Sequence, residues 1–170
     1  MRQLVFKYAL AVSAASISLK LVIFFTENQF SKMGDYSSYL IFLFILIGVY
    51  FGMRNARTLN SSHTQSFREN INTGCKIAAM NALVMGVFIY VYYNFIDSAY
   101  FTEKIRNTLS LMTENNYTKE QMKEYYLNAR LLFFAADKVA SFTLFGYLLL
   151  GCFYAVVSGF VLRKNAVSGI

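Results

Sequence analysis

Four long apolar segments, separated by polar stretches, dominate the pattern of hydrophobic and polar positions along this chain. They cover residues 4–25, 36–53, 71–96 and 139–162. A helix needs about 20 apolar residues to cross the hydrocarbon core of a bilayer, and each segment approaches or reaches that length. The pattern therefore predicts an all-α fold: a bundle of four transmembrane helices that forms a single membrane domain over residues 1–170.

Local signals refine the helix boundaries. Residues 26–38 are polar and are expected to connect the first two helices. Ser66 and Glu69 have the S-x-x-E spacing of a capping box, so the third helix is expected to begin near residue 67, ahead of its apolar part. The chain contains no proline, which excludes proline kinks within the helices.

The first apolar segment also has features of a cleaved signal peptide. A basic n-region precedes the small-residue sequence VSAAS, which resembles a cleavage site. The apolar pattern resumes after Lys20 as LVIFF, however, and extends the segment to a full membrane span. We therefore favour a retained transmembrane helix.

Residues 97–138 form the one sizeable polar segment between apolar segments. Two apolar stripes at helical spacing run through it, namely Phe101, Ile105, Leu109 and Met112, and then Met122, Tyr125, Ala129, Leu132 and Ala136. Asn115 and Asn116 suit a turn between the stripes. Thr118 with Gln121 has the spacing of a second capping box. The segment is expected to be an amphipathic helical hairpin that stays close to the membrane.

Aromatic residues cluster where the third apolar segment ends, at Phe88, Tyr90, Tyr92, Tyr93 and Phe95. Tyrosine suits the level of the lipid headgroups because its ring is apolar and its hydroxyl is polar. We interpret the cluster as an interfacial belt and not as a ligand-binding aromatic box.

Small residues recur at every fourth position in three of the apolar segments. Helices in a bilayer associate through close backbone approach, which small side chains permit. The repeats are therefore candidate packing faces, and those of the third and fourth helices are expected to face each other. The candidate packing residues are Gly48, Gly52, Gly74, Ala78, Ala82, Gly86, Gly151, Ala155 and Gly159.

The net charge of +7 is distributed unevenly along the chain. Three regions are strongly basic: the two ends of the chain and the connection between the second and third apolar segments. Glu69 is their single acidic residue, whereas the numbers of basic and acidic residues are equal in the rest of the chain. Their basic residues are Arg2, Lys7, Arg54, Arg57, Arg68, Lys76, Arg163 and Lys164. The positive-inside rule then predicts a multi-pass protein of the bacterial inner membrane with both termini cytoplasmic and the hairpin extracytoplasmic. This charge pattern indicates topology and contact with the lipid bilayer, and it does not support a nucleic-acid partner.

Four polar residues are candidates for intramembrane function: Lys20, Lys76, Asn81 and Asn94. Polar groups are costly in lipid and often mark a pathway for a substrate or ion. The simpler interpretation is that the lysines snorkel to the headgroups and that Asn81 makes an interhelical hydrogen bond. We favour the simpler interpretation because no acidic residue lies at mid-depth, where an ion or proton relay generally needs one.

The sequence does not specify a reaction. His63 is the only histidine and has no second ligand nearby in the sequence, and Cys75 and Cys152 lack the spacing of a metal site. The hydrolase motifs G-x-S-x-G and H-E-x-x-H are absent from the sequence. We therefore predict no catalytic residues, no metal site and no cofactor.

A non-enzymatic accessory or scaffold subunit of an envelope complex is the function that these features favour. Its expected partners are the lipid bilayer and other membrane proteins or a second copy of the chain. The alternative is a transporter or flippase-type component, for example a helper of polyprenyl-phosphate-sugar glycosyltransfer, and this alternative rests on analogy with other small four-helix proteins. An enzyme ranks third.

The chain resembles an uncharacterised family of small four-helix inner-membrane proteins common in Bacteroidota, known as domain of unknown function 4199. The resemblance rests on FGMRNAR at Phe51–Arg57, on SFRENINTG at Ser66–Gly74, and on the charged hairpin before a last helix that ends in Arg-Lys. This chain has Arg68 and Glu69 where the family often has glycine and lysine. The resemblance implies a location in the cell envelope, and it transfers no functional residues because the family has no established activity.

Overall fold

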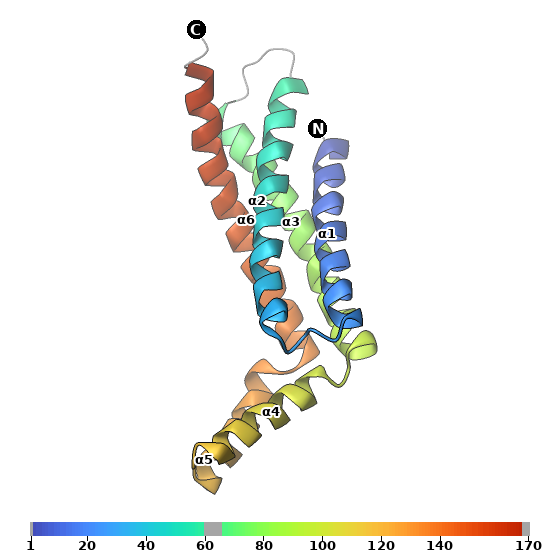
Figure 1. Ribbon diagram of the computed structural model, residues 1–170. Helices are drawn as coiled ribbons and strands as arrows, with labels where there is room; N and C mark the ends of the chain where they lie inside the picture. Colours follow the sequence, from blue (N-terminus) through green and yellow to red (C-terminus); the bar gives the residue numbers. More distant parts are fainter. Residues whose placement is uncertain (1, 60–65, 168–170) are drawn as a thin grey trace. The chain divides into compact units, whose positions relative to one another are not determined.

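The computed structural model describes residues 2–59 and 66–167 as a series of helices (Figure 1). The α-helices are α1 (Arg2–Phe25), α2 (Lys32–Leu59), α3 (Phe67–Val91), α4 (Tyr100–Glu114), α5 (Lys119–Asn128) and α6 (Ala136–Val167). Two π-helical segments, η1 (Tyr92–Ile96) and η2 (Ala129–Phe133), follow α3 and α5. The described residues contain no strand, so the predicted all-α fold class is confirmed.

Four helices are long and apolar enough to cross a membrane, which confirms the predicted number of spans. They cover Arg2–Phe25, Lys32–Leu59, Phe67–Ile96 and Ala136–Arg163. Charged residues are absent from the middle of each span, as the sequence of residues 8–19, 36–53, 77–96 and 139–162 shows. The amphipathic segments α4 and α5 lie between the third and fourth spans in the chain, as predicted.

The described helices divide into two compact units. The bundle unit comprises Met1–Met85 and Leu144–Ile170, and the hairpin unit comprises Gly86–Thr143. Within the bundle unit, α1, α2 and the parts of α3 and α6 that belong to it run side by side (Figure 1).

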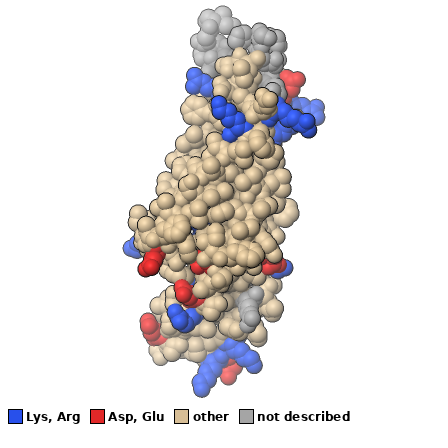
Figure 2. Space-filling model, turned by 90° about the vertical axis from the view of Figure 1, so that its right-hand side faces the viewer, with Lys and Arg blue, Asp and Glu red and all other residues tan. Residues whose placement is uncertain are grey.

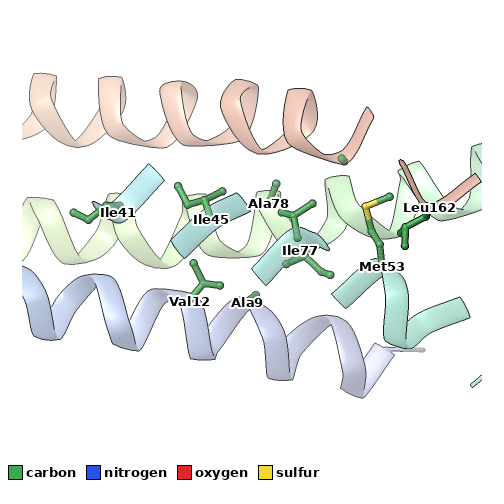
Figure 3. Close-up of a cluster of buried hydrophobic side chains, with 10 residues drawn as sticks. Ala9, Val12, Ile41, Ile45, Met53, Ile77, Ala78 and Leu162 are labelled. Atoms are coloured by element: carbon green, nitrogen blue, oxygen red, sulfur yellow. The ribbon is translucent and has the colours of Figure 1, made fainter. Parts of the chain in front are cut away.

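An apolar core fills the space between the four helices of the bundle unit (Figure 3). The side chains of Ile45, Met53 and Ile77 are among the largest that are fully buried. The core cluster consists of Ala9, Val12, Ile41, Ile45, Val49, Met53, Ile77, Ala78, Ala155 and Leu162. The cluster contains both large side chains and alanines. The helices therefore approach closely where alanine lies between them and are farther apart where a large side chain does.

Helix α2 begins at Lys32, so the second half of the polar connection predicted over residues 26–38 is helical. Ser31 caps the helix, because its Oγ accepts a hydrogen bond from the Met33 backbone N–H at 3.2 Å. Gly34 follows in the first turn, where a Cβ would lie 2.7 Å from the carbonyl oxygens of Asn28 and Gln29. Glycine is therefore required for the tight approach of the connection to α2.

Both predicted capping boxes are present. At the start of α3, the Ser66 N–H donates to Glu69 Oε2 at 2.9 Å, and the Glu69 N–H donates to Ser66 Oγ at 3.2 Å. At the start of α5, Thr118 and Gln121 make the same reciprocal pair of hydrogen bonds. These contacts satisfy backbone N–H groups that a helix leaves unpaired at its first turn, and they fix where each helix begins.

Aromatic side chains pack against one another in the hairpin unit. Two of them, Tyr92 and Tyr93, are buried, so the interpretation as an interfacial belt is wrong for these two tyrosines. Tyr92 is fully buried and its hydroxyl donates to Asp97 Oδ2 at 3.0 Å. Tyr93 is also buried, with its ring centroid 4.5 Å from that of Phe101. Buried tyrosines keep a polar partner for the hydroxyl, and here a carboxylate supplies it in place of water. Tyr90 remains exposed, as a belt residue would be.

The second apolar stripe of the hairpin is shorter than predicted. Ala129 is 3% exposed, but Leu132 is 55% exposed and lies in the π-helical segment that follows α5. Phe134 then leaves helical geometry, with φ −106° and ψ 61°, before α6 starts at Ala136. The stripe fails beyond Ala129 because the wider turn changes the angular step between successive side chains. The predicted turn is present, and Asn116 adopts a positive φ of 57° there.

Candidate functional site

A polar cavity of about 300 Å³ lies in the bundle unit, where α2 and α6 approach their carboxyl ends and α3 begins. Its lining residues are Arg57, Phe67, Asn70, Gly159 and Arg163. We call it the arginine cavity. The hairpin unit contains a cavity of about 230 Å³ whose described lining residues are uncharged: Phe101, Thr102, Ile105, Tyr126 and Phe134. The arginine cavity is therefore the stronger candidate for a binding site, because it combines concave shape with convergent charge.

Arg57 is held in place by a hydrogen bond to another helix. It lies in the last turn of α2, and its Nη1 donates to the backbone carbonyl of Leu162 on α6. A guanidinium has five N–H donors, so this bond leaves most of them available to other acceptors. The contact ties the ends of α2 and α6 together and fixes one cationic wall of the cavity.

Phe67 forms an aromatic wall of the cavity. Its ring centroid lies 5.0 Å from that of Phe160, and the Arg163 guanidinium carbon lies 5.8 Å from the Phe67 centroid. A cation over an aromatic face is attracted by the ring quadrupole, which orients the Arg163 side chain. Gly159 keeps the α6 backbone near this ring, because a Cβ there would lie 3.1 Å from Phe67 Cε2.

Asn70 contributes a buried polar group to the cavity. The residue is 4% exposed, and its Oδ1 has no hydrogen-bond partner within the described part of the protein. Burying an acceptor without a partner costs about 1–3 kcal/mol. The side chain is therefore suited to accept a hydrogen bond from a ligand in the cavity.

Basic side chains surround this end of the bundle unit. Figure 2 shows Lys and Arg gathered at one end of the unit and an uncharged band along its helices. The acid nearest in sequence to the cavity residues is Glu69, whose carboxylate accepts from Ser66 at the start of α3. Among the described residues, the cavity lining contains two cations and no anion, so its field favours an anionic ligand.

The four predicted intramembrane polar residues have different surroundings. Asn81 is 1% exposed and accepts a hydrogen bond from Ser13 Oγ at 2.8 Å, which is the kind of interhelical contact expected. Asn94 belongs to the hairpin unit and donates to the Tyr90 carbonyl at 2.8 Å. Lys76 is exposed and Lys20 is half-buried. None of the four lines the arginine cavity.

Several predicted packing residues lie in close helix contacts. A Cβ on Gly74 would lie 2.6 Å from the Ala155 Cβ, and one on Gly151 would overlap the Ala78 Cβ. The structure thus brings the small residues of α3 and α6 together in these two pairs.

The remaining packing candidates also lie inside the protein. Gly48 approaches the Val12 side chain of α1, and Gly52 approaches Ile77 of α3. Ala82 and Gly86 are buried. Gly159 contacts Phe67 and Ile71 and also lines the cavity.

No chemical role was predicted for His63, Cys75 or Cys152. His63 lies outside the described residues. Cys75 and Cys152 are free cysteines and half-buried. No group of three or more His, Cys, Asp or Glu side chains suited to a metal ion occurs in residues 2–59 and 66–167.

The sequence analysis missed the arginine cavity. It interpreted Arg57 and Arg163 as topology signals only, and it gave Asn70 no role. One signal was available, because Asn70 and Thr73 lie on the same helical face as the buried Ile77 and Asn81. A polar residue on the buried face of an apolar helix, one turn after an N-cap, indicates a polar site near the membrane surface.

Comparison with known proteins identifies the family. The sequence model of the family described as "Protein of unknown function (DUF4199)" matches residues 7–164. The chain belongs to the DUF4199 family. The match covers the first span from residue 7 onward, the other three spans, the hairpin and every residue of the arginine cavity. No curated protein and no solved structure matches this DUF4199 member significantly.

Proposed function

We propose that the protein is a non-enzymatic accessory or scaffold subunit of an envelope complex in the bacterial inner membrane. The observation that supports this proposal best is the outer face of α6. This face carries large apolar side chains that are mostly exposed: Phe145 is 63%, Leu149 71% and Phe153 62% exposed. Gly146 lies among them, and a Cβ on it would meet no heavy atom within 4 Å. In a bilayer, a notch flanked by large side chains suits the close approach of a helix from another protein.

The packed interior of the bundle unit supports the same proposal. Small residues close the contacts between α3 and α6 at Gly74 and Gly151, and an apolar cluster fills the centre. A carrier needs polar groups along a path through its own helices. The buried Ser13 and Asn81 side chains bond to each other, which is a structural use of their polarity.

We further propose that both termini are cytoplasmic and that the hairpin is extracytoplasmic. The distribution of the +7 charge supports this orientation. The prediction can be tested with single cysteines at Asn116 in the hairpin and at Ser62 in the polar connection, in a background with Cys75 and Cys152 replaced by alanine. An impermeant thiol reagent added to intact spheroplasts should label Asn116→Cys and not Ser62→Cys. The reverse pattern would show that the charges do not set the orientation.

A transporter or flippase-type component, such as a helper of polyprenyl-phosphate-sugar glycosyltransfer, is the second candidate. The arginine cavity favours it, because two guanidinium groups at the end of the spans suit a phosphate. We rank it second because the cavity belongs to one end of the bundle unit, while the core cluster of that unit is apolar and the buried Ser13 hydroxyl is bonded to Asn81.

Photo-crosslinking in native membranes tests the subunit proposal. A photoreactive phenylalanine analogue is placed at Leu149 on the exposed face of α6, and at Ile47 on α2 as a matched control that is also exposed. A discrete protein adduct of constant mass is expected from position 149 and not from position 47. If neither position gives a protein adduct, the outer face of α6 is covered by lipid and the proposal loses its main support. Equal protein adducts from both positions would show that the contact is not specific to α6, and the same support would be lost.

A further inference from the structure

We infer that the arginine cavity binds the headgroup of a membrane phospholipid. Arg57 and Arg163 hold its phosphate, and Asn70 accepts a hydrogen bond from a donor at the far end of the headgroup. The inference concerns a ligand of this chain and is independent of whether the chain serves as a subunit. Failure of the lipid experiment would leave the crosslinking experiment unaffected.

The depth of the cavity in the membrane is the first argument. Arg57 lies one turn beyond Met53, where the uncharged part of the α2 span ends, and Arg163 directly follows the α6 residue Leu162. Both guanidinium groups therefore lie where transmembrane helices leave the hydrocarbon core. Phosphates of the lipid headgroups occupy the same level, so a phospholipid can reach the cavity by diffusion within its own leaflet.

The chemistry of the two arginines is the second argument. A guanidinium presents its N–H donors in a planar fork that matches two oxygens of a phosphate. Arg57 and Arg163 are each held by a contact that leaves part of the fork open: a hydrogen bond to the Leu162 carbonyl for Arg57, and the Phe67 ring for Arg163. Side chains that are already oriented lose less conformational entropy when a ligand binds.

Asn70 supplies the third argument and narrows the ligand class. Its Oδ1 is buried and has no hydrogen-bond partner in the part of the chain that the structure describes. A fully ionised phosphate monoester, such as the headgroup of phosphatidic acid, has no donor for this acceptor, whereas the ammonium of phosphatidylethanolamine and the hydroxyls of phosphatidylglycerol are donors. The combination of two cations and one acceptor therefore fits a phosphodiester headgroup with a donor at its far end.

Size and surroundings agree with a headgroup. The cavity of about 300 Å³ falls at the small end of ligand sites, and it suits a headgroup better than a whole lipid. The ring of Phe160 packs at a tilt against the cavity residue Phe67. Phe160 is 58% exposed and the next residue, Val161, is 45% exposed. These side chains continue the cavity into an apolar surface along which the acyl chains of the lipid would lie.

Native mass spectrometry of the full chain in detergent provides the test. The protein is delipidated and titrated with phosphatidylethanolamine, phosphatidylglycerol, phosphatidic acid and inorganic phosphate. We expect the first two lipids to bind, and Arg57→Gln and Arg163→Gln each to weaken this binding about tenfold or more, as expected for loss of a charged hydrogen bond. Arg54→Gln is the matched control, because Arg54 is an exposed arginine on the same helix that does not line the cavity, and it should change affinity less than about twofold.

Asn70→Leu tests the donor argument separately. It should weaken binding of phosphatidylethanolamine and phosphatidylglycerol, yet leave phosphatidic acid nearly unchanged, since that lipid has no group beyond the phosphate. Thermal stability of each variant in the same detergent confirms that the bundle is folded. Equal lipid binding by the wild type and both cavity arginine variants would overturn the inference. The inference would also be overturned if inorganic phosphate displaced the lipid at concentrations similar to those at which the lipid binds, because the site would then bind free phosphate.

Discussion

Two glycines on the same helix offer a direct test of how α3 and α6 are held together. Gly146 and Gly151 lie five residues apart on α6, yet a Cβ on Gly146 would meet nothing within 4 Å, whereas one on Gly151 would overlap the Ala78 Cβ and lie 3.3 Å from its Cα. Ala78 belongs to α3 and cannot rotate its methyl group away. The substitution Gly151→Ala therefore forces the two helices apart, while Gly146→Ala adds a methyl group to an open surface.

The expected free energies follow from two contributions. Replacing glycine by alanine in a helix stabilises it by up to about 1 kcal/mol, and this gain applies to both positions. Overpacking a close contact costs about 1–3 kcal/mol, and this cost applies to Gly151 alone. The difference between the two variants thus isolates the packing contribution, with Gly146→Ala about 1–3 kcal/mol the more stable.

Reversible unfolding in mixed detergent and dodecyl sulfate measures this difference. By the scaling for chains of this size, the gap corresponds to roughly 2–12 °C in the midpoint of thermal unfolding. Within a bilayer-like environment no water fills the gap that the separated helices would leave, so the cost should not be relieved by relaxation. If Gly151→Ala were as stable as Gly146→Ala, the approach of α6 to Ala78 would not contribute to stability, and the argument would be wrong.

Three further predictions address the polar contact, the ridge on α3 and the hairpin. A double-mutant cycle with Ser13→Ala and Asn81→Ala should give a coupling energy of about 0.5–1.7 kcal/mol by unfolding in the same detergent, and additive effects would show that the hydrogen bond is not formed. Ala82→Leu should lower the thermal aggregation temperature more than Val87→Leu, because Ala82 is 1% and Val87 is 66% exposed, and equal effects would contradict this assignment of faces. Residues 97–138 expressed alone should lack a cooperative thermal transition by circular dichroism, since so short a segment cannot build an independent core; a cooperative transition would contradict this.

The sequence was sufficient to predict features that depend on local pattern. The four spans follow from apolar length, and the start of α3 follows from Ser66 and Glu69, whose capping box is present in the structure. The start of α2 was missed because Gly34 interrupts the helical pattern after the cap, although glycine there relieves a contact with the preceding connection. Helix propensity counts against glycine, and the tertiary contact that selects it cannot be observed in one sequence.

Features that depend on irregular helix turns or on contacts between helices were not predictable. Tyr92 looked like an interfacial tyrosine, but it is buried and its hydroxyl donates to nearby Asp97 across a π-helical turn. The arginine cavity brings together residues from three helices, and no spacing in the chain indicates that Arg57 and Arg163 converge. Patterns within one helix show which face is apolar, but they do not show which residues of other helices meet it.

Arg57 illustrates why topology and binding must be argued from different properties of the same residue. The positive-inside rule depends on charge near the end of a span, so Arg54 and Arg57 are equivalent in that respect. In the structure only Arg57 donates to the Leu162 carbonyl and lines a cavity, whereas Arg54 is exposed. A lysine at either position would satisfy the topology signal, but its single ammonium has no fork with which to bridge a carbonyl and a phosphate. The geometry of the guanidinium at position 57, and not its charge alone, is therefore what supports a binding site at this end of the bundle unit.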